Sequence, residues 1–208
     1  MNKVLDKLFN LVKFDKKYVF FSLIIVLTGI IFGSLFIVIL NKTDKNLVIE
    51  YIQEFISSIR NNTFNYIGTF KSTISINVII IITMIILGIS CILSPFNILI
   101  LFYKSFIIGF SVSSFILTFK MKGLLLSIIY IFPHFVLNIL IFCILTAFTL
   151  KLSINLIKST LRKKKVNLGL YFQKYIFVIF IFIMLISITS VYESFAVPYL
   201  FKKIVLFL

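Results

Sequence analysis

Ionisable side chains inside long apolar stretches are the residues of this sequence best suited to chemistry. Lys104, His134 and Glu193 stand in segments that are otherwise free of charge. Charged groups are costly in the hydrocarbon of a membrane, so they often mark a route for protons or ions. At about 1.5 Å of helix rise per residue, Lys104 and His134 share a depth near the midplane. Glu193 falls near the outer end of its segment, closer to Lys120 and Lys122 than to Lys104.

Two roles are open for these three groups. In the structural one, Lys104 extends toward the inner membrane surface, Glu193 extends toward the outer one, and His134 bonds to a neighbouring helix. In the functional one, Lys104 and His134 serve a small membrane transporter or permease subunit. The sequence alone does not separate these roles.

Motifs of self-contained catalysis are missing from the sequence. Five of the six acids lie outside the apolar segments. No glycine-rich phosphate loop, His-Glu-x-x-His or Cys-x-x-Cys pair occurs. The segment Gly109-Phe-Ser-Val-Ser113 lacks the final glycine of a nucleophile elbow. We therefore expect no enzymatic activity, no cofactor and no metal site.

The composition is that of a membrane protein. The chain is 61% hydrophobic and 13% charged, whereas soluble domains are about 45–50% apolar and about 25% charged. A net charge of +15 would suggest nucleic acid in a soluble protein, but here the basic residues flank apolar stretches. We expect membrane lipid and no nucleic acid as a partner. Cys91 and Cys143 fall in apolar segments and are expected to be free thiols.

The fold class that follows is all-α, a single polytopic bundle of about five transmembrane helices with flanking amphipathic helices. A span needs roughly 20 apolar residues to cross about 30 Å of hydrocarbon. Lipid cannot satisfy a bare backbone, so such spans must be helical. The predicted spans are 18–40, 74–93, 96–119, 123–150 and 175–197.

The distribution of basic residues predicts the orientation. Segments 1–17 and 151–174 carry five and seven lysines or arginines. The positive-inside rule places both in the cytoplasm, with loop 41–73 and tail 198–208 outside. The count is twelve basic residues inside against eight outside. Basic faces on the two cytoplasmic segments suit anionic lipid.

An apolar stripe at helical spacing runs along the external loop. Such a stripe can rest on lipid or receive a partner helix. We expect it to dock a partner, so that Phe55→Asp would abolish docking without affecting insertion. Its members are Val48, Ile52, Phe55, Ile56 and Ile59.

Small residues and prolines predict how the helices meet and turn. Gly29 and Gly33 form a G-x-x-x-G pair, and Gly109 lies midway between Ser105 and Ser113 at four-residue spacing. Small residues at this spacing let helix backbones approach closely in lipid. Ser94-Pro95 predicts a tight hairpin between the second and third spans. Pro133 is expected to kink the fourth span.

The order of these features resembles the stage II sporulation protein M family over nearly the whole chain. The residues that carry the resemblance are Gly29, Gly33, Gly88, Pro95, Lys104, Gly109, Phe110, Gly123, Pro133, His134, Glu193 and Pro198. The chain departs from many members at Phe135, Asn138 and Leu140, where they have glycine, glutamate and proline. Losing that glutamate favours a scaffold over ion movement.

The resemblance implies a role in endospore formation. The protein would be a membrane-embedded scaffold of the peptidoglycan-degrading engulfment machinery. It would recruit the cell-wall hydrolases, stage II sporulation proteins P and D, to the sporulation septum and the engulfing mother-cell membrane. Oligomeric state stays open.

Overall fold

The computed structural model describes the backbone of residues 16–90, 92–130, 132–161 and 168–205, and the side chains of 16–90, 92–128, 135–157 and 178–203. Most of segment 1–17 and the middle of segment 151–174 lie outside the described residues. The described elements are all helical, which confirms the all-α fold class. They are α2 (Lys16–Ile39), α3 (Lys42–Arg60), α4 (Tyr66–Ile89), α5 (Phe96–Phe119), α6 (Met121–Tyr130), α7 (Phe132–Leu161), α8 (Leu168–Val191), the π-helix η1 (Tyr192–Ala196) and α9 (Val197–Val205).

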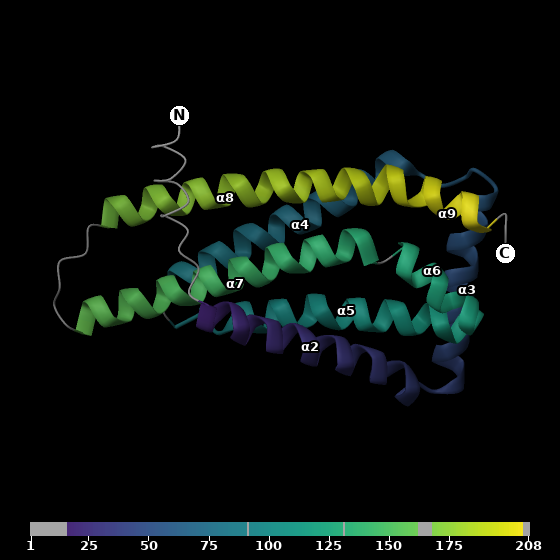
Figure 1. Cartoon of the computed structure of the whole chain (residues 1–208), viewed down its shortest axis with the longest axis horizontal. Coiled ribbons are helices and arrows are strands. Elements are labelled where there is room, and N and C mark those ends of the chain that lie inside the picture. Colours follow the sequence, from purple (N-terminus) through teal and green to yellow (C-terminus); the bar gives the residue numbers. More distant parts are fainter. Residues whose placement is uncertain (1–15, 91, 131, 162–167, 206–208) are drawn as a thin grey trace.

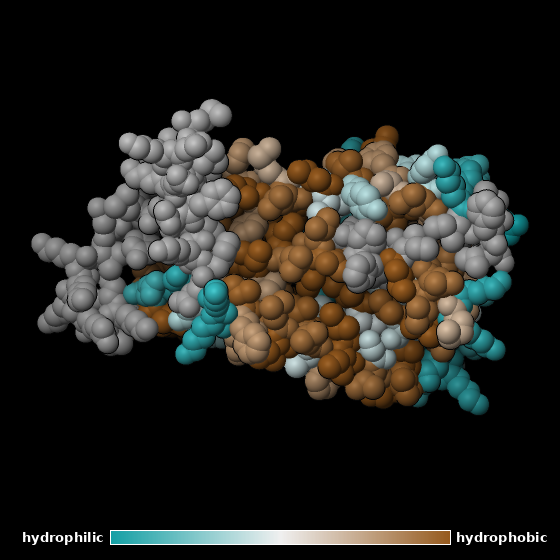
Figure 2. All heavy atoms as spheres, viewed as in Figure 1, coloured by the Kyte–Doolittle hydropathy of each residue, from teal (hydrophilic) through white to brown (hydrophobic). Residues whose placement is uncertain are grey.

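Within the described part of the chain, five helices are long and apolar enough to cross a membrane. These spans are Lys16–Ile39, Tyr66–Ile89, Phe96–Phe119, Phe135–Ile157 and Val178–Lys203. The long helices run along the bundle, while α3 stands across one end, where α6 and α9 also lie (Figure 1). Apolar residues cover the middle of the surface, and hydrophilic ones gather at the end with α3 (Figure 2). This banding is that of a lipid-facing surface.

The second span begins earlier than predicted. The sequence placed it at 74–93, whereas α4 covers Tyr66–Ile89. Asn65 caps the helix, because its Oδ1 accepts a hydrogen bond from the N–H of Gly68 at 2.9 Å. Such a cap satisfies a backbone donor at the helix start, so the helix extends beyond its apolar core.

The predicted fourth span is divided between two helices. The predicted range 123–150 covers most of α6 and much of α7, and within the described side chains the apolar stretch is Phe135–Ile157. Proline lacks an N–H and is favoured in the first turn of a helix. Pro133 is the second residue of α7. Residue 131, where α6 would join α7, lies outside the described residues, and so does the kink expected there. Segment α6 folds back on α5, where an added Cβ at Gly123 would lie 2.0 Å from the Phe115 carbonyl oxygen.

The last span is longer than predicted and has no non-helical tail directly after 197. Helix α8 continues through η1 into α9, and the apolar span reaches Lys203. In η1 the N–H of Val197 bonds to the carbonyl of Tyr192, the five-residue spacing of a π turn. This wider turn directly precedes Pro198, which has no N–H to donate. The chain therefore stays helical past the proline.

Cysteine labelling tests the predicted orientation, which puts α3 outside and the turn between α4 and α5 in the cytoplasm. In a background carrying Cys91→Ala and Cys143→Ala, Asn46→Cys on α3 should react with an impermeant maleimide in intact cells. Ile92→Cys in the turn should react only after cells are opened. Both positions are exposed, so lack of access would not explain a negative result. The opposite pattern would reverse the orientation.

Candidate functional site

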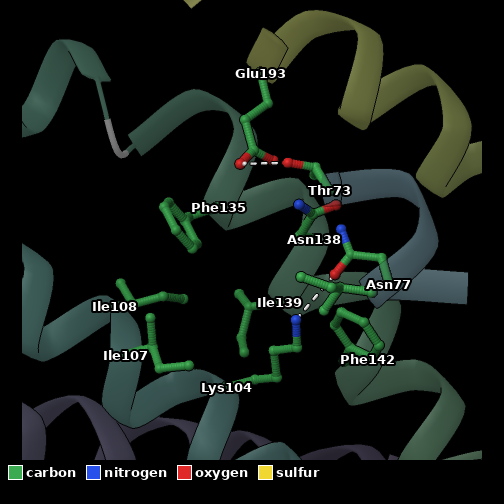
Figure 3. A pocket seen from close by; sticks show the side chains of 11 residues that line it. Thr73, Asn77, Lys104, Ile107, Ile108, Phe135, Asn138, Ile139, Phe142 and Glu193 are labelled. Carbon is green, nitrogen blue, oxygen red and sulfur yellow. Dashed lines mark hydrogen bonds between the residues drawn. The ribbon is translucent and has the colours of Figure 1, made fainter. Parts of the chain in front are cut away.

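A pocket of about 190 Å³ lies between α4, α5, α7 and η1. Its polar side chains come from all four helices and face one another (Figure 3). Two of them are four residues apart on α4, which puts them on one helix face. The polar lining is Thr73, Asn77, Lys104, Asn138 and Glu193.

Each charged group of the pocket has a neutral hydrogen-bond partner. The ammonium of Lys104 donates to Oδ1 of Asn77 at 2.9 Å and lies 5.2 Å from the ring centre of Phe142. The hydroxyl of Thr73 donates to a carboxylate oxygen of Glu193 at 3.5 Å. Lys104 and Glu193 line the same pocket, so a positive and a negative charge on them attract each other across it.

The position of Glu193 corrects the expectation that it lies near Lys120 and Lys122. It faces the pocket of Lys104 instead (Figure 3). The physical reason is the continuation of the span through η1 and α9, which leaves Glu193 well inside the helix rather than near its end. Lys104 likewise points to Asn77 and does not extend to the inner surface. The side chains of Pro133 and His134 lie outside the described residues.

Removing either charge of the pocket should destabilise the protein more than removing both. A single charge left in an apolar interior has no opposite charge near it, whereas two uncharged side chains need none. We expect Lys104→Met and Glu193→Gln each to lower the free energy of unfolding by about 1–3 kcal/mol, the cost of leaving a buried hydrogen-bonding group without its partner. The double variant should lose less than the sum of the two losses. Thermal unfolding in detergent gives this double-mutant cycle, and additive losses would show that the charges act independently.

A second pocket, of about 260 Å³, lies beneath α3. Phe135 and Glu193 line it as well as the first pocket. Its other residues come from α3 and α5, and they include the hydroxyls of Ser111 and Ser114. The two pockets thus meet at Phe135 and Glu193.

The apolar stripe of α3 is covered by the chain itself, which corrects its assignment as a docking surface. Ile52 and Ile59 are buried, and the remaining three members pack against the same cluster. The cluster partners are Phe115, Leu126 and Phe201 from α5, α6 and α9. An amphipathic pattern shows that the apolar face of a helix must pack against another apolar surface, but not which one. Here that surface is the end of the bundle.

Glycines bring α2 and α5 into backbone contact. A Cβ added at Gly29 would lie 2.8 Å from the Phe102 carbonyl oxygen, and one at Gly33 would lie 2.1 Å from that of Phe106. Gly109 faces the backbone of Ile30 in the same way. These close approaches make α2 and α5 a tightly packed pair.

The other residues of the resemblance have packing positions. Gly88 and Pro198 are buried, and Pro95 precedes α5. Phe110 stacks on Phe106, with ring centres 6.5 Å apart. Cys143 is a buried free thiol, and Cys91 lies outside the described residues.

Asparagines within the spans form hydrogen bonds between helices, and sequence reasoning did not single out Asn77 and Asn97. Asn97 is fully buried, and its amide donates to the Met84 carbonyl at 2.9 Å and to Oγ1 of Thr149 at 3.0 Å. Asn138 accepts a hydrogen bond from Thr189. Together with Asn77, these amides connect α4, α5, α7 and α8. Their occurrence in apolar segments could have indicated these contacts, because a buried amide requires hydrogen-bond partners on neighbouring helices.

Within the described part of the chain, no three His, Cys, Asp or Glu residues lie close enough together to hold a metal ion.

A family model described as stage II sporulation protein M matches residues 22–198. No curated protein and no solved structure matches the chain. The matched region begins within α2 and ends at the start of α9, so it covers the three middle spans, most of the first and last spans, and the linings of both pockets.

Proposed function

The chain belongs to the stage II sporulation protein M family, and on this basis we propose that it is a scaffold of the engulfment machinery. It is a multi-pass membrane protein of sporulation. In the proposed role it recruits peptidoglycan hydrolases, stage II sporulation proteins P and D, to the septum and the engulfing mother-cell membrane. The hydrolases carry out the chemistry, and this chain performs none itself.

The single observation that best supports a platform is the placement of α3. Its apolar stripe packs on the bundle, so the helix is fixed across one end of it (Figure 1). The opposite face is exposed and combines apolar with acidic side chains. Leu47 is 62% exposed and Tyr51 is 75% exposed. A rigid helix that presents such residues suits a protein partner, because exposed aromatic side chains often anchor interfaces.

The outward face of α3, defined as Leu47, Glu50, Tyr51 and Glu54, is the proposed docking surface. Under the predicted orientation its acids lie outside the cell membrane, where cell-wall hydrolases work. This surface replaces the buried stripe as the contact. The proposed partner segment is therefore basic and apolar, complementary to the carboxylates and to the two large side chains.

Septal localisation of fluorescently tagged hydrolase tests the proposal. Tyr51→Ala combined with Leu47→Glu should leave the protein in the membrane but lower recruitment at least about tenfold, as loss of an interface anchor does. Met121→Ala is the matched control, since Met121 is 79% exposed on α6 at the same end of the bundle. Normal recruitment by the double variant, with membrane levels checked by blotting, would exclude this face.

A small membrane transporter is the second candidate, and the pocket containing Lys104 and Glu193 favours it. The pair differs from the Lys104 and His134 pair expected from the sequence. At equal membrane levels, Lys104→Met should leave hydrolase recruitment unchanged if the protein is a scaffold. A stable Lys104→Met protein that supports no engulfment would favour transport.

A further inference from the structure

The pocket between α4, α5, α7 and η1 has a positive group at one end and a negative group at the other. Figure 3 shows Glu193 and Lys104 well apart, with Asn138 and Asn77 between them. In the described part of the chain, their hydrogen bonds go to Thr73 and Asn77 rather than to each other. In an apolar interior, direct pairing would be the simplest way to compensate two charges. Because the two charges are held apart, the pocket is complementary to a molecule that carries two opposite charges.

Both charged groups retain hydrogen-bonding capacity for such a molecule. An ammonium has three donors, and Asn77 takes one from Lys104. A carboxylate accepts at two oxygens, and Thr73 donates to one oxygen of Glu193. The amides of Asn77 and Asn138 add further donors or acceptors along the pocket wall. The polar wall is therefore complementary to a carboxylate at one end and an amine at the other.

The volume limits the size of the molecule. The pocket measures about 190 Å³, somewhat more than the roughly 150 Å³ of an engineered protein cavity that holds benzene. A ligand of about six to eight non-hydrogen atoms fits this space. The opposite wall is apolar and includes Ile107, Ile108 and Ile139 (Figure 3). We propose that the pocket binds a small zwitterion of the α-amino acid class, with its carboxylate on Lys104, its ammonium on Glu193 and a short aliphatic side chain against the isoleucines.

The second pocket supplies a route to this site. It shares Phe135 and Glu193 with the first pocket and is lined at the α3 end by Tyr51, which is 75% exposed. Ser111 and Ser114 place hydroxyls along this route. A zwitterion entering from the α3 end meets Glu193 first and Lys104 last. The proposed site predicts ligand binding only, so a negative result for hydrolase recruitment would not contradict it, and a negative result for binding would not contradict recruitment.

Ligand-dependent thermal stabilisation of the full-length protein in detergent tests the site. The probe is L-alanine, with propionate and ethylammonium as matched compounds that each lack one of its charges. Alanine should raise the unfolding midpoint in a saturable manner, since it binds only the folded state. Each single-charge compound should bind at least about tenfold more weakly, because one charge-assisted contact is missing. Equal binding of propionate or ethylammonium, or no binding of alanine at millimolar concentration, would overturn the proposal.

Variants locate the binding. Lys104→Met and Glu193→Gln should each weaken alanine binding at least about tenfold. Ile107→Phe keeps both charges but fills the pocket, so it should abolish binding even if the charge variants fail to fold. Lys42→Met and Asp44→Asn are the controls, because both residues are exposed at the start of α3. Alanine binding that survives Ile107→Phe in a folded protein would overturn the assignment.

Discussion

Gly109→Ala is expected to abolish accumulation of folded protein, although it adds a single methyl group. The new Cβ would lie 2.0 Å from the carbonyl oxygen of Ile30 and 2.8 Å from its carbonyl carbon. Both atoms belong to the α2 backbone, so the clash is relieved only if α2 and α5 separate. Separation also breaks the contacts of Gly29 and Gly33 with α5. We expect the free energy of unfolding to fall by about 3 kcal/mol or more, at or beyond the usual range for overpacking.

The matched control for Gly109→Ala is Gly68→Ala. It adds the same methyl group to another helical glycine, but the nearest atoms belong to the side chain of Asn65, which can move. Moving Asn65 loses a cap that contributes about 1 kcal/mol. The higher helix propensity of alanine offsets this loss by about 1 kcal/mol. Thermal unfolding in detergent and membrane yield should therefore distinguish the two variants. Similar behaviour of both would show that contact between α2 and α5 does not determine stability.

Phe55→Asp should strongly reduce the amount of folded protein, in contrast to the sequence-based expectation of selective loss of docking. Phe55 makes an edge-to-face contact with Phe64 at 5.9 Å between ring centres, and its ring centre lies 6.3 Å from that of the fully buried Phe201. Loss of the ring costs about 3 kcal/mol. The carboxylate then lies in an apolar cluster and adds a desolvation cost. Thermal unfolding should show a large decrease in the midpoint.

Tyr51→Asp is the control for Phe55→Asp on the same helix. Tyr51 is 75% exposed, so the same replacement should leave the unfolding midpoint within a few degrees of the original, as most surface changes do. A stable Phe55→Asp protein would mean that α3 is not held by its apolar stripe. Under the scaffold proposal, Tyr51→Asp should still impair recruitment of hydrolases.

Helical content and family were predictable from the sequence, and both are confirmed. Five long apolar segments can only be helices in lipid, because the backbone has no other partner there. Family membership was readable because the order of small residues, prolines and charges along the chain is itself a linear property. The family match over residues 22–198 agrees with that order.

Helix boundaries near prolines and caps were less predictable. The position of Pro133 indicated a disturbance of the fourth span, and Pro133 lies in the first turn of α7. The π turn before Pro198 is invisible in composition. Asn65 extends α4 beyond its apolar core through one hydrogen bond. Each of these features depends on the local backbone conformation, which can differ between sequences of equal hydropathy.

The candidate site was decided only by tertiary structure. The sequence singled out Lys104, His134 and Glu193 individually, and it assigned Glu193 to the wrong neighbours. The placement of Glu193 in the same pocket as Lys104 depends on the rotation of η1 about its axis and on the lateral position of α5. Contacts between residues distant in the chain determine both. The same applies to α3, whose stripe required an apolar cover that the sequence could not identify. Length and hydropathy determine which segments are spans, because each residue contributes its own transfer free energy into a hydrocarbon layer that is the same for every segment. Which side chains meet inside the bundle depends on how separate helices pack, and that is a property of the folded chain alone.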